Sequence, residues 1–319
     1  MTTASVTVTV DNFIRAESDL YMRGIVAQGG LGKILSRREP ASIEHQTVIR
    51  LNRDTLYSSA VFDLDAGPVT ITLPDPGDRY LALQVISEDH FVPHVFYGAG
   101  THVLTADNVG TRYVVIAVRI LVNPNDAGDL KKVHELQDAI AVDQQAPGTL
   151  DMPDWDKDSQ TKVRNALLVL ASTLPDFSHA FGTKDDVDPV HRLVGAAAAW
   201  GGNPDKDAMY LNITPEKNDG KTVYRLHVED VPVDGFWSVS VYNAEGYYEP
   251  NARNVYGLNN LTASKNADGS IDVQFGGCDG ENSNCLPIMA GWNYMVRLYR
   301  PRPEILQGRW HFPEAKPGG

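Results

Sequence analysis

Two series of short apolar segments limit what this chain can fold into. Between about 48 and 121 the segments read LYSSAVFDL, VTITL, YLALQVI, HVLT and RYVVIAVRILV, and from 209 onward they read MYLNI, TVYRLHV, FWSVSVYN, IDVQFG and NYMVRLYRP. These segments are rich in β-branched and aromatic residues, and the stretches between them, such as PDPGD, GAG and NADGS, are turn formers. We therefore expect a mainly β protein with two antiparallel β-sandwich or jelly-roll-like domains.

A helical pattern lies between the two series and another precedes the first. We expect an N-terminal helix over about 12–28, capped by Asp11, because Asp at a helix start satisfies free N–H groups. Three further helices should begin near Asp126 or Asp129, Asp158 and Asp188, the last followed by Pro189. The predicted domains are residues 1–140 (N-terminal helix plus β-sandwich), 141–205 (helical connection) and 206–319 (C-terminal β-sandwich).

The charge balance limits the partners of the protein. With 41 acidic and 28 basic side chains the formal net charge is −13, which opposes binding to nucleic acid or to an anionic membrane. No window is apolar for long enough to span a membrane, and the first residues lack the pattern of a signal peptide. We expect a cytoplasmic protein, or a mature form whose leader was removed, that binds a small-molecule substrate. A homo-oligomer is compatible with this sequence.

The chain contains two cysteines, Cys278 and Cys285, on either side of a turn-rich loop. A cytoplasmic protein keeps its thiols reduced, so we expect structural or incidental free thiols. A local disulfide is the alternative, and it would imply an oxidising compartment.

Ionisable residues gather directly after the apolar segment Tyr80–Ile86. Glu88, Asp89, His90 and His94 follow within eight positions of Ile86, among apolar residues whose burial would shift their pKa values. Alternate residues of a strand share a face, so the Glu88 carboxylate and the two imidazoles could converge as metal ligands. Pro93 argues against a regular strand there, because Pro donates no ladder hydrogen bond.

His90 is the preferred catalytic or ligating residue of this group, oriented by the carboxylates before it. His94 would be a second ligand or an acid–base group. The competing interpretation makes His90 a hydrogen-bonded core residue. Three aromatic side chains could line an apolar cofactor pocket beside His90, namely Phe91, Phe96 and Tyr97.

A second polar run, Asn52-Arg-Asp-Thr-Leu-Tyr57, comes just before the segment LYSSAVFDL. A side-chain-bonded turn is the simpler interpretation. The alternative puts Asp54 and Tyr57 in a cleft, where an acid and a phenol could fix a polar substrate or complete an iron site.

Several motifs together resemble one family. They include the Asn52–Tyr57 run, Leu83-Gln84, Trp200-Gly-Gly202, Asp234-Gly-Phe-Trp-Ser238 and Arg297-Leu-Tyr-x-Pro301. The chain from about 40 to 315 is similar to the bacterial two-domain proteins of unknown function, families twelve-fifty-four (N-terminal) and twelve-fourteen (C-terminal). The resemblance implies two unlike β-sandwich domains with a helical insert. Some relatives carry esterase-like labels, and the resemblance also suggests an association with oxygenases that cleave the side-chain alkene of phenylpropenes. The segment Ser87–His90 departs from the polar stretch usual at this position.

Three functions follow from these observations. The first is an oxygenase-like enzyme that acts on a small apolar or aromatic molecule, with haem or non-haem iron at His90. The second is a cofactor-independent, esterase-like hydrolase with His90 as general base. The third is a non-catalytic ligand-binding module. No nucleotide cofactor is expected, because the sequence contains no P-loop and no G-x-G-x-x-G motif.

Overall fold

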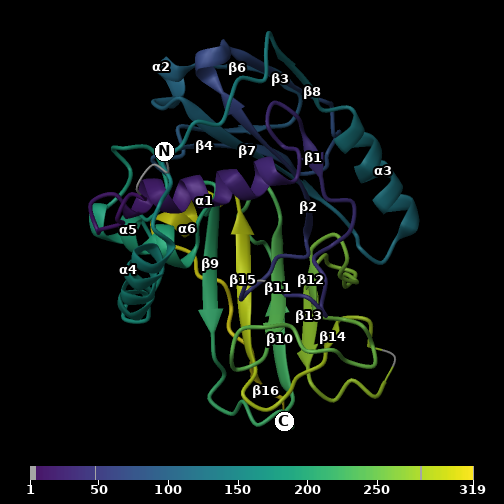
Figure 1. Cartoon of the computed structure of the whole chain (residues 1–319). Coiled ribbons are helices and arrows are strands. Elements are labelled where there is room, and N and C mark those ends of the chain that lie inside the picture. Colours follow the sequence, from purple (N-terminus) through teal and green to yellow (C-terminus); the bar gives the residue numbers. More distant parts are fainter. Residues whose placement is uncertain (1–4, 47, 281, 319) are drawn as a thin grey trace. The chain divides into compact units, whose positions relative to one another are not determined.

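The computed structural model describes residues 5–46, 48–280 and 282–318. The chain forms two compact units. The first contains the chain up to Arg38, Leu56–Leu121 and Leu130–Asp205, and the second contains Glu39–Thr55, Val122–Asp129 and the chain from Lys206. The expectation of a mainly β fold with antiparallel sheets is confirmed (Figure 1). Residues 141–205, expected as a helical connection, lie in the first unit, and the chain from Lys206 lies in the second.

The first unit contains two sheets. The larger has the strand order β1 (Leu35–Ser36), β2 (Thr55–Asp63), β7 (Tyr113–Leu121), β4 (Leu81–Ser87) and β5 (His94–Tyr97). The smaller has the order β6 (Gly100–Leu104), β3 (Val69–Leu73) and β8 (Ala141–Gln144). Every residue of β4 is buried, as expected for an inner strand with apolar and small side chains on both faces.

Helices complete the first unit. They are α1 (Phe13–Ala27), α2 (Ala106–Val109), α4 (Lys157–Ala171) and α5 (Pro189–Ala198), with a 3₁₀ turn at Leu64–Ala66; α3 (Ala127–Asp138) begins at the unit boundary. The α1 residues Phe13 and Ala16 pack with Leu167 of α4 and Val194 of α5. No helix in the described ranges is long and apolar enough to cross a membrane.

The helix caps were predicted with mixed success. Asp188 caps α5 as expected, accepting bonds from the N–H groups of Val190 and His191. Asp156, and not Asp158, caps α4 through the N–H of Ser159. The helix expected over about 12–28 is present as α1, but the predicted Asp11 cap is wrong, because the N-cap residue is Asn12 and makes no side-chain cap bond. The position of α1 within the first unit is therefore fixed by packing and by the contacts of its buried polar residues.

The second unit is a β-sandwich. One sheet has the order β14 (Cys285–Leu286), β13 (Ile271–Phe275), β10 (Tyr224–Val228) and β16 (Lys316–Pro317), and the other β12 (Gly257–Asn259), β11 (Trp237–Tyr242), β15 (Asn293–Tyr299) and β9 (Ala208–Ile213). Inward side chains of both sheets, such as Leu226, Val273, Val239 and Val296, form one core. The short helix α6 (Pro303–Leu306) adds Ile305 to this core.

A buried arginine joins the segment before β2 to this sandwich. Arg297 of β15 donates from Nη2 to the carbonyl oxygens of Arg50 (2.8 Å) and Leu51 (3.2 Å) and to the hydroxyl of Tyr242 (2.7 Å). Its Nη1 donates to Oγ of Ser240 at 3.1 Å. A guanidinium can satisfy these acceptors at once because its donors lie in a rigid plane.

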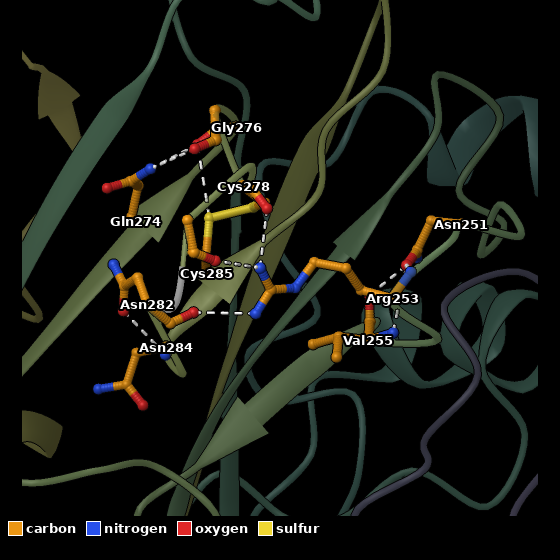
Figure 2. The surroundings of a disulfide bond; sticks show 11 residues. Asn251, Arg253, Val255, Gln274, Gly276, Cys278, Asn282, Asn284 and Cys285 are labelled. Carbon is orange, nitrogen blue, oxygen red and sulfur yellow. Dashed lines mark hydrogen bonds between the residues drawn. A yellow bond between two sulfur atoms is a disulfide. The ribbon is translucent and has the colours of Figure 1, made fainter.

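Cys278 and Cys285 form a disulfide, so the expectation of free thiols is wrong. Figure 2 shows the guanidinium of Arg253 beside the loop that the disulfide closes. Its nitrogens donate to the carbonyl oxygens of Cys278 (2.8 Å), Gly280 (3.1 Å) and Asn282 (3.0 Å). The disulfide and this arginine together hold a loop that has little apolar material of its own.

Candidate functional site

The residues after β4 leave the strand pattern at once. The Ser87 N–H donates to the carbonyl of Phe91 and the His90 N–H to the carbonyl of Ser87, which closes a tight turn. His90 has a φ of 61°, a left-handed conformation that a non-glycine residue adopts at a cost. Because of this turn, Glu88, His90 and His94 do not alternate along one strand face as predicted.

His90 is completely buried and is held by a backbone donor. The Gly201 N–H donates to its Nε2 at 2.9 Å, the Trp200 ring stacks on it at 5.4 Å, and Phe181 meets it edge-on at 5.8 Å. Burial, and then the charge of Arg192, lower the pKa of His90 to about 3. The imidazole is therefore neutral at physiological pH. Since Nε2 accepts a bond, its proton is on Nδ1, which has no partner among the described residues.

The segment that binds His90 is fixed from its other side as well. Arg119 of β7 donates to the Gly201 carbonyl at 3.2 Å and to the Gln84 side-chain oxygen at 2.5 Å. Gln84 of β4 in turn donates to the Gly202 carbonyl at 2.7 Å. The sequence predicted that carboxylates orient His90; that prediction is wrong, because the groups that contact its ring are Gly201, Trp200 and Phe181.

Two buried carboxyl groups meet where β4 ends against α1. Asp19 of α1 is fully buried and its Oδ2 accepts a bond from the Trp155 indole at 2.7 Å. Glu88, whose N–H donates to Oγ1 of Thr111 at 3.0 Å, shares a side-chain hydrogen bond with Asp19. Burial raises the pKa of both groups, that of Glu88 to about 7, and the negative charge of Asp19 acts in the same direction on Glu88. We call Asp19 and Glu88 the carboxyl pair.

Arg15 lies between the carboxyl pair and solvent. Its Nη1 is 3.1 Å from Oε2 of Glu88, and its Nη2 is 2.5 Å from Oδ1 of Asp89. The side chains of Arg15 and Asp89 are 37% and 42% exposed, compared with 7% for Glu88. Arg15 favours the ionised form of Glu88, whereas burial and Asp19 favour the protonated form. Glu88 therefore changes between its protonated and ionised forms close to neutral pH.

The predicted metal ligands are not brought together. In the described part of the chain, no three His, Cys, Asp or Glu side chains are placed to hold a metal ion. Glu88 is engaged by Asp19 and Arg15, His90 accepts from Gly201, and His94 stacks on Phe96 at 5.3 Å. The structure therefore does not bring Glu88, His90 and His94 together as metal ligands, contrary to the sequence prediction.

The predicted aromatic pocket is not assembled either. Phe96 and Tyr97 are neighbours on β5 and so point to opposite faces. Tyr97 packs on Tyr80 with ring centres 5.9 Å apart. Phe91 is covered by the Arg192 guanidinium, 3.9 Å from its ring centre. The three rings therefore do not line one cofactor site.

Asp54 and Tyr57 have separate surroundings. Asp54 is buried in the second unit, where Asn259 donates to its Oδ1 at 3.2 Å. Burial raises its pKa, and the positive charge of Arg297 opposes that rise. Tyr57, on β2 of the first unit, has the Arg119 guanidinium 5.3 Å from its ring centre. The positive charge of Arg297 therefore acts on Asp54 within the second unit.

Sequence analysis missed Asp19, Arg15 and Trp155. One signal was present, because α1 contains the consecutive polar residues Glu17-Ser18-Asp19, all of them buried. Ser18 accepts from the Trp200 indole, and Glu17 pairs with Arg164. Three consecutive buried polar residues in a helix require partners elsewhere in the fold. The identity of those partners depends on the tertiary structure.

Family comparisons agree with the motifs. The profile "Protein of unknown function (DUF1254)" matches residues 32–101, and "Protein of unknown function (DUF1214)" matches residues 208–303. The chain is a two-domain DUF1254–DUF1214 protein. The DUF1214 match lies within the second unit, whereas the DUF1254 match includes Glu39–Thr55 of the second unit as well as β2 to β5.

Solved structures support the same fold. The VPA0106 protein from Vibrio parahaemolyticus is 17% identical with a TM-score of 0.73, over 97% of this chain and 98% of that one. An uncharacterised protein from Burkholderia cenocepacia is 14% identical with a TM-score of 0.53, over 96% of this chain and 86% of that one. No curated protein matches the chain. At these identities, the similarity to the two solved structures shows the fold of this DUF1254–DUF1214 protein alone.

Proposed function

We propose that the protein is an enzyme that transfers protons through the carboxyl pair and hydrolyses a small molecule without a bound cofactor. The observation that carries this proposal is the position of Glu88, whose side chain is 7% exposed and lies 3.1 Å from Arg15, in surroundings that raise its pKa to about 7. A carboxyl group with this pKa is present in both forms at neutral pH, so it can accept and donate a proton. Carboxyl groups perturbed in this way concentrate at catalytic sites.

Each contact of Glu88 has a role in such a step. Ionised Glu88 takes a proton from water as the water oxygen bonds to the ester carbonyl carbon. The same proton then passes to the departing alkoxide oxygen as its bond to carbon breaks, which leaves an acid, an alcohol and the original carboxylate. Arg15, 3.1 Å from Glu88, stabilises the ionised form, and the hydrogen bond with Asp19 stabilises the protonated form.

Hydrolysis of p-nitrophenyl acetate tests this proposal. We expect Glu88→Gln to reduce the rate by about 10²-fold or more, the usual contribution of a general base. Asp89→Asn is the matched control, because it removes a neighbouring carboxylate that also pairs with Arg15, and it should retain most activity. Asp19→Asn should move the inflection of the pH–rate profile below about 7, since it removes the charge that raises the Glu88 pKa. Equal rates in wild type and Glu88→Gln would contradict the proposal, and saturable binding without turnover would favour a binding module.

Haem or non-haem iron at His90 is the competing proposal. The Nδ1 atom favours it, because it is buried and has no partner among the described residues. The other residues do not fit, since Nε2 is engaged by Gly201 and no set of three ligands forms in the described ranges. Iron analysis and an absorption spectrum of wild type and His90→Asn decide between the two proposals, because iron bound by wild type alone would restore the oxygenase hypothesis.

The disulfide supports a different location from the cytoplasm predicted from the sequence. Structural disulfides persist where the surroundings are oxidising, and Cys278–Cys285 closes a loop that Arg253 also binds. We propose that the protein acts in such a compartment. After alkylation of the protein in its native host, mass spectrometry should find both cysteines unmodified because they are joined in the disulfide. Two alkylated thiols would contradict this location.

A further inference from the structure

A groove of about 480 Å³ lies on the outward face of one sheet of the second unit. Arg225 and His227 project into it from β10, Asp272 and Gln274 from β13, and Lys316 from β16. The alternate residues of β10 are buried in the sandwich core, so the polar side chains belong to the solvent-facing side of this sheet. The three strands are neighbours in the sheet labelled in Figure 1.

Two cations lie side by side in this groove. Arg225 is directly opposite Lys316 in the register of β10 and β16. Like charges at such positions repel, because their Cβ atoms are only about 5 Å apart. Within the ranges that the structure describes, neither side chain has an ion pair with a carboxylate. This arrangement is unexpected in a protein with a net charge of −13, where an acidic partner would be easy to supply.

A fixed imidazole lies next to the two cations. His227 is directly opposite Asp272, whose Oδ1 is 2.7 Å from Nδ1 of the ring, and Asn266 donates to the other Asp272 oxygen at 2.8 Å. The ring is therefore held with its Nδ1–H donating a hydrogen bond to the Asp272 carboxylate. Nε2 is then the atom left for a further contact, with the nearest carboxylate, that of Glu229, 3.9 Å away.

We propose that this groove binds a small molecule through an oxyanion, a carboxylate or a phosphate ester, held by Arg225 and Lys316. The bound oxyanion accepts hydrogen bonds from both cations and removes their mutual repulsion. Glu314 also lines the groove, so the rest of the ligand is neutral or cationic. This site is separate from the carboxyl pair, which belongs to the first unit, and does not depend on the function proposed there.

Calorimetric titration with inorganic phosphate and, separately, with benzoate tests the site in the full chain. The variant is Arg225→Gln with Lys316→Gln, and the control is Lys217→Gln with Lys221→Gln, which removes two exposed lysines of the same unit outside the groove. We expect wild type and control to bind one of the two anions, and the groove variant to bind it about tenfold or more weakly, as for the loss of charged hydrogen bonds. Binding of phosphate alone indicates a phosphate ester, and binding of benzoate alone a carboxylate.

A thermal melt of the same proteins without added anion separates lost binding from lost structure. The groove variant should melt at or above the wild-type temperature, because the repulsion between Arg225 and Lys316 is gone. No binding of either anion by wild type would overturn the proposal. Equal affinities in wild type and groove variant would overturn it as well.

Discussion

Glu88 and His90 are two residues apart, but their surroundings shift their pKa values in opposite directions. Both are buried, and burial disfavours the charged form of each. For Glu88 this raises the pKa to about 7, and for His90 it lowers the pKa to about 3. His90 is therefore fixed in one charge state over the physiological range, whereas Glu88 changes state within it. For this reason we propose Glu88 as the acid–base group in place of His90, which the sequence favoured.

The raised pKa of Glu88 predicts how stability depends on pH. The unfolded chain releases this proton near 4.5 and the folded protein near 7, so the folded state binds more protons between these values and its stability falls as pH rises through them. Glu88→Gln cannot ionise and escapes this loss. We expect the variant to gain about 1–3 kcal/mol relative to wild type between about pH 5 and pH 8.

Urea unfolding of both proteins at the two pH values measures this change. Asp89→Asn is again the control, and its stability relative to wild type should change little between them. A constant difference between Glu88→Gln and wild type would show that Glu88 is already ionised at about pH 5.

At the scale of elements, the sequence predicted strands and some helix ends better than it predicted the site. The fully buried strand β4 and the Asp188 cap of α5 follow from local composition. The contact between Asp19 and Trp155 joins residues 136 positions apart, and no local pattern encodes it. The turn at His90 also broke the alternation on which the metal set depended, because its φ of 61° takes the chain out of the strand.

Several residues that suggested the family hold elements together. Gln84 binds Gly202, and Arg297 binds the carbonyl groups of Arg50 and Leu51. Arg297 also provides positive charge for Asp54, which is buried with it. A buried charge that loses its partner is destabilising by about 3–5 kcal/mol.

Arg297→Met should therefore destabilise the protein by about 3–5 kcal/mol, because the carbonyl oxygens of Arg50 and Leu51 lose their donor and Asp54 loses a nearby positive charge. If Asp54 is ionised, adding Asp54→Asn should recover part of this loss, since it removes the charge left without a partner. Urea unfolding of the two single variants and the double variant gives the coupling energy. Strictly additive effects would mean that Asp54 is protonated in the folded protein.

For the whole molecule, the sequence predicted two β-rich regions. It did not predict that Glu39–Thr55 and Val122–Asp129 belong to the second unit. Loops of this kind have little periodicity, and their partners, such as Tyr248 for Gln46 and Tyr242 for Leu51, lie about two hundred positions away. The disulfide was missed because a cytoplasmic location was expected, and cysteines in the cytoplasm are usually reduced.

The disulfide provides a prediction that distinguishes the two units. It joins residues seven positions apart, and closing so short a loop should stabilise the folded state by on the order of 2 kcal/mol through the entropy of the unfolded chain. Replacing both cysteines by serine should therefore speed amide exchange in β10 and β13, which belong to the sheet that contains Cys285. Strands β2, β4 and β7 have their own core in the first unit, so their exchange should not change. Hydrogen–deuterium exchange read by mass spectrometry measures both sets of strands in one sample. Faster exchange in both units alike would mean that the protein opens as a single cooperative unit and that the loop supports all of it.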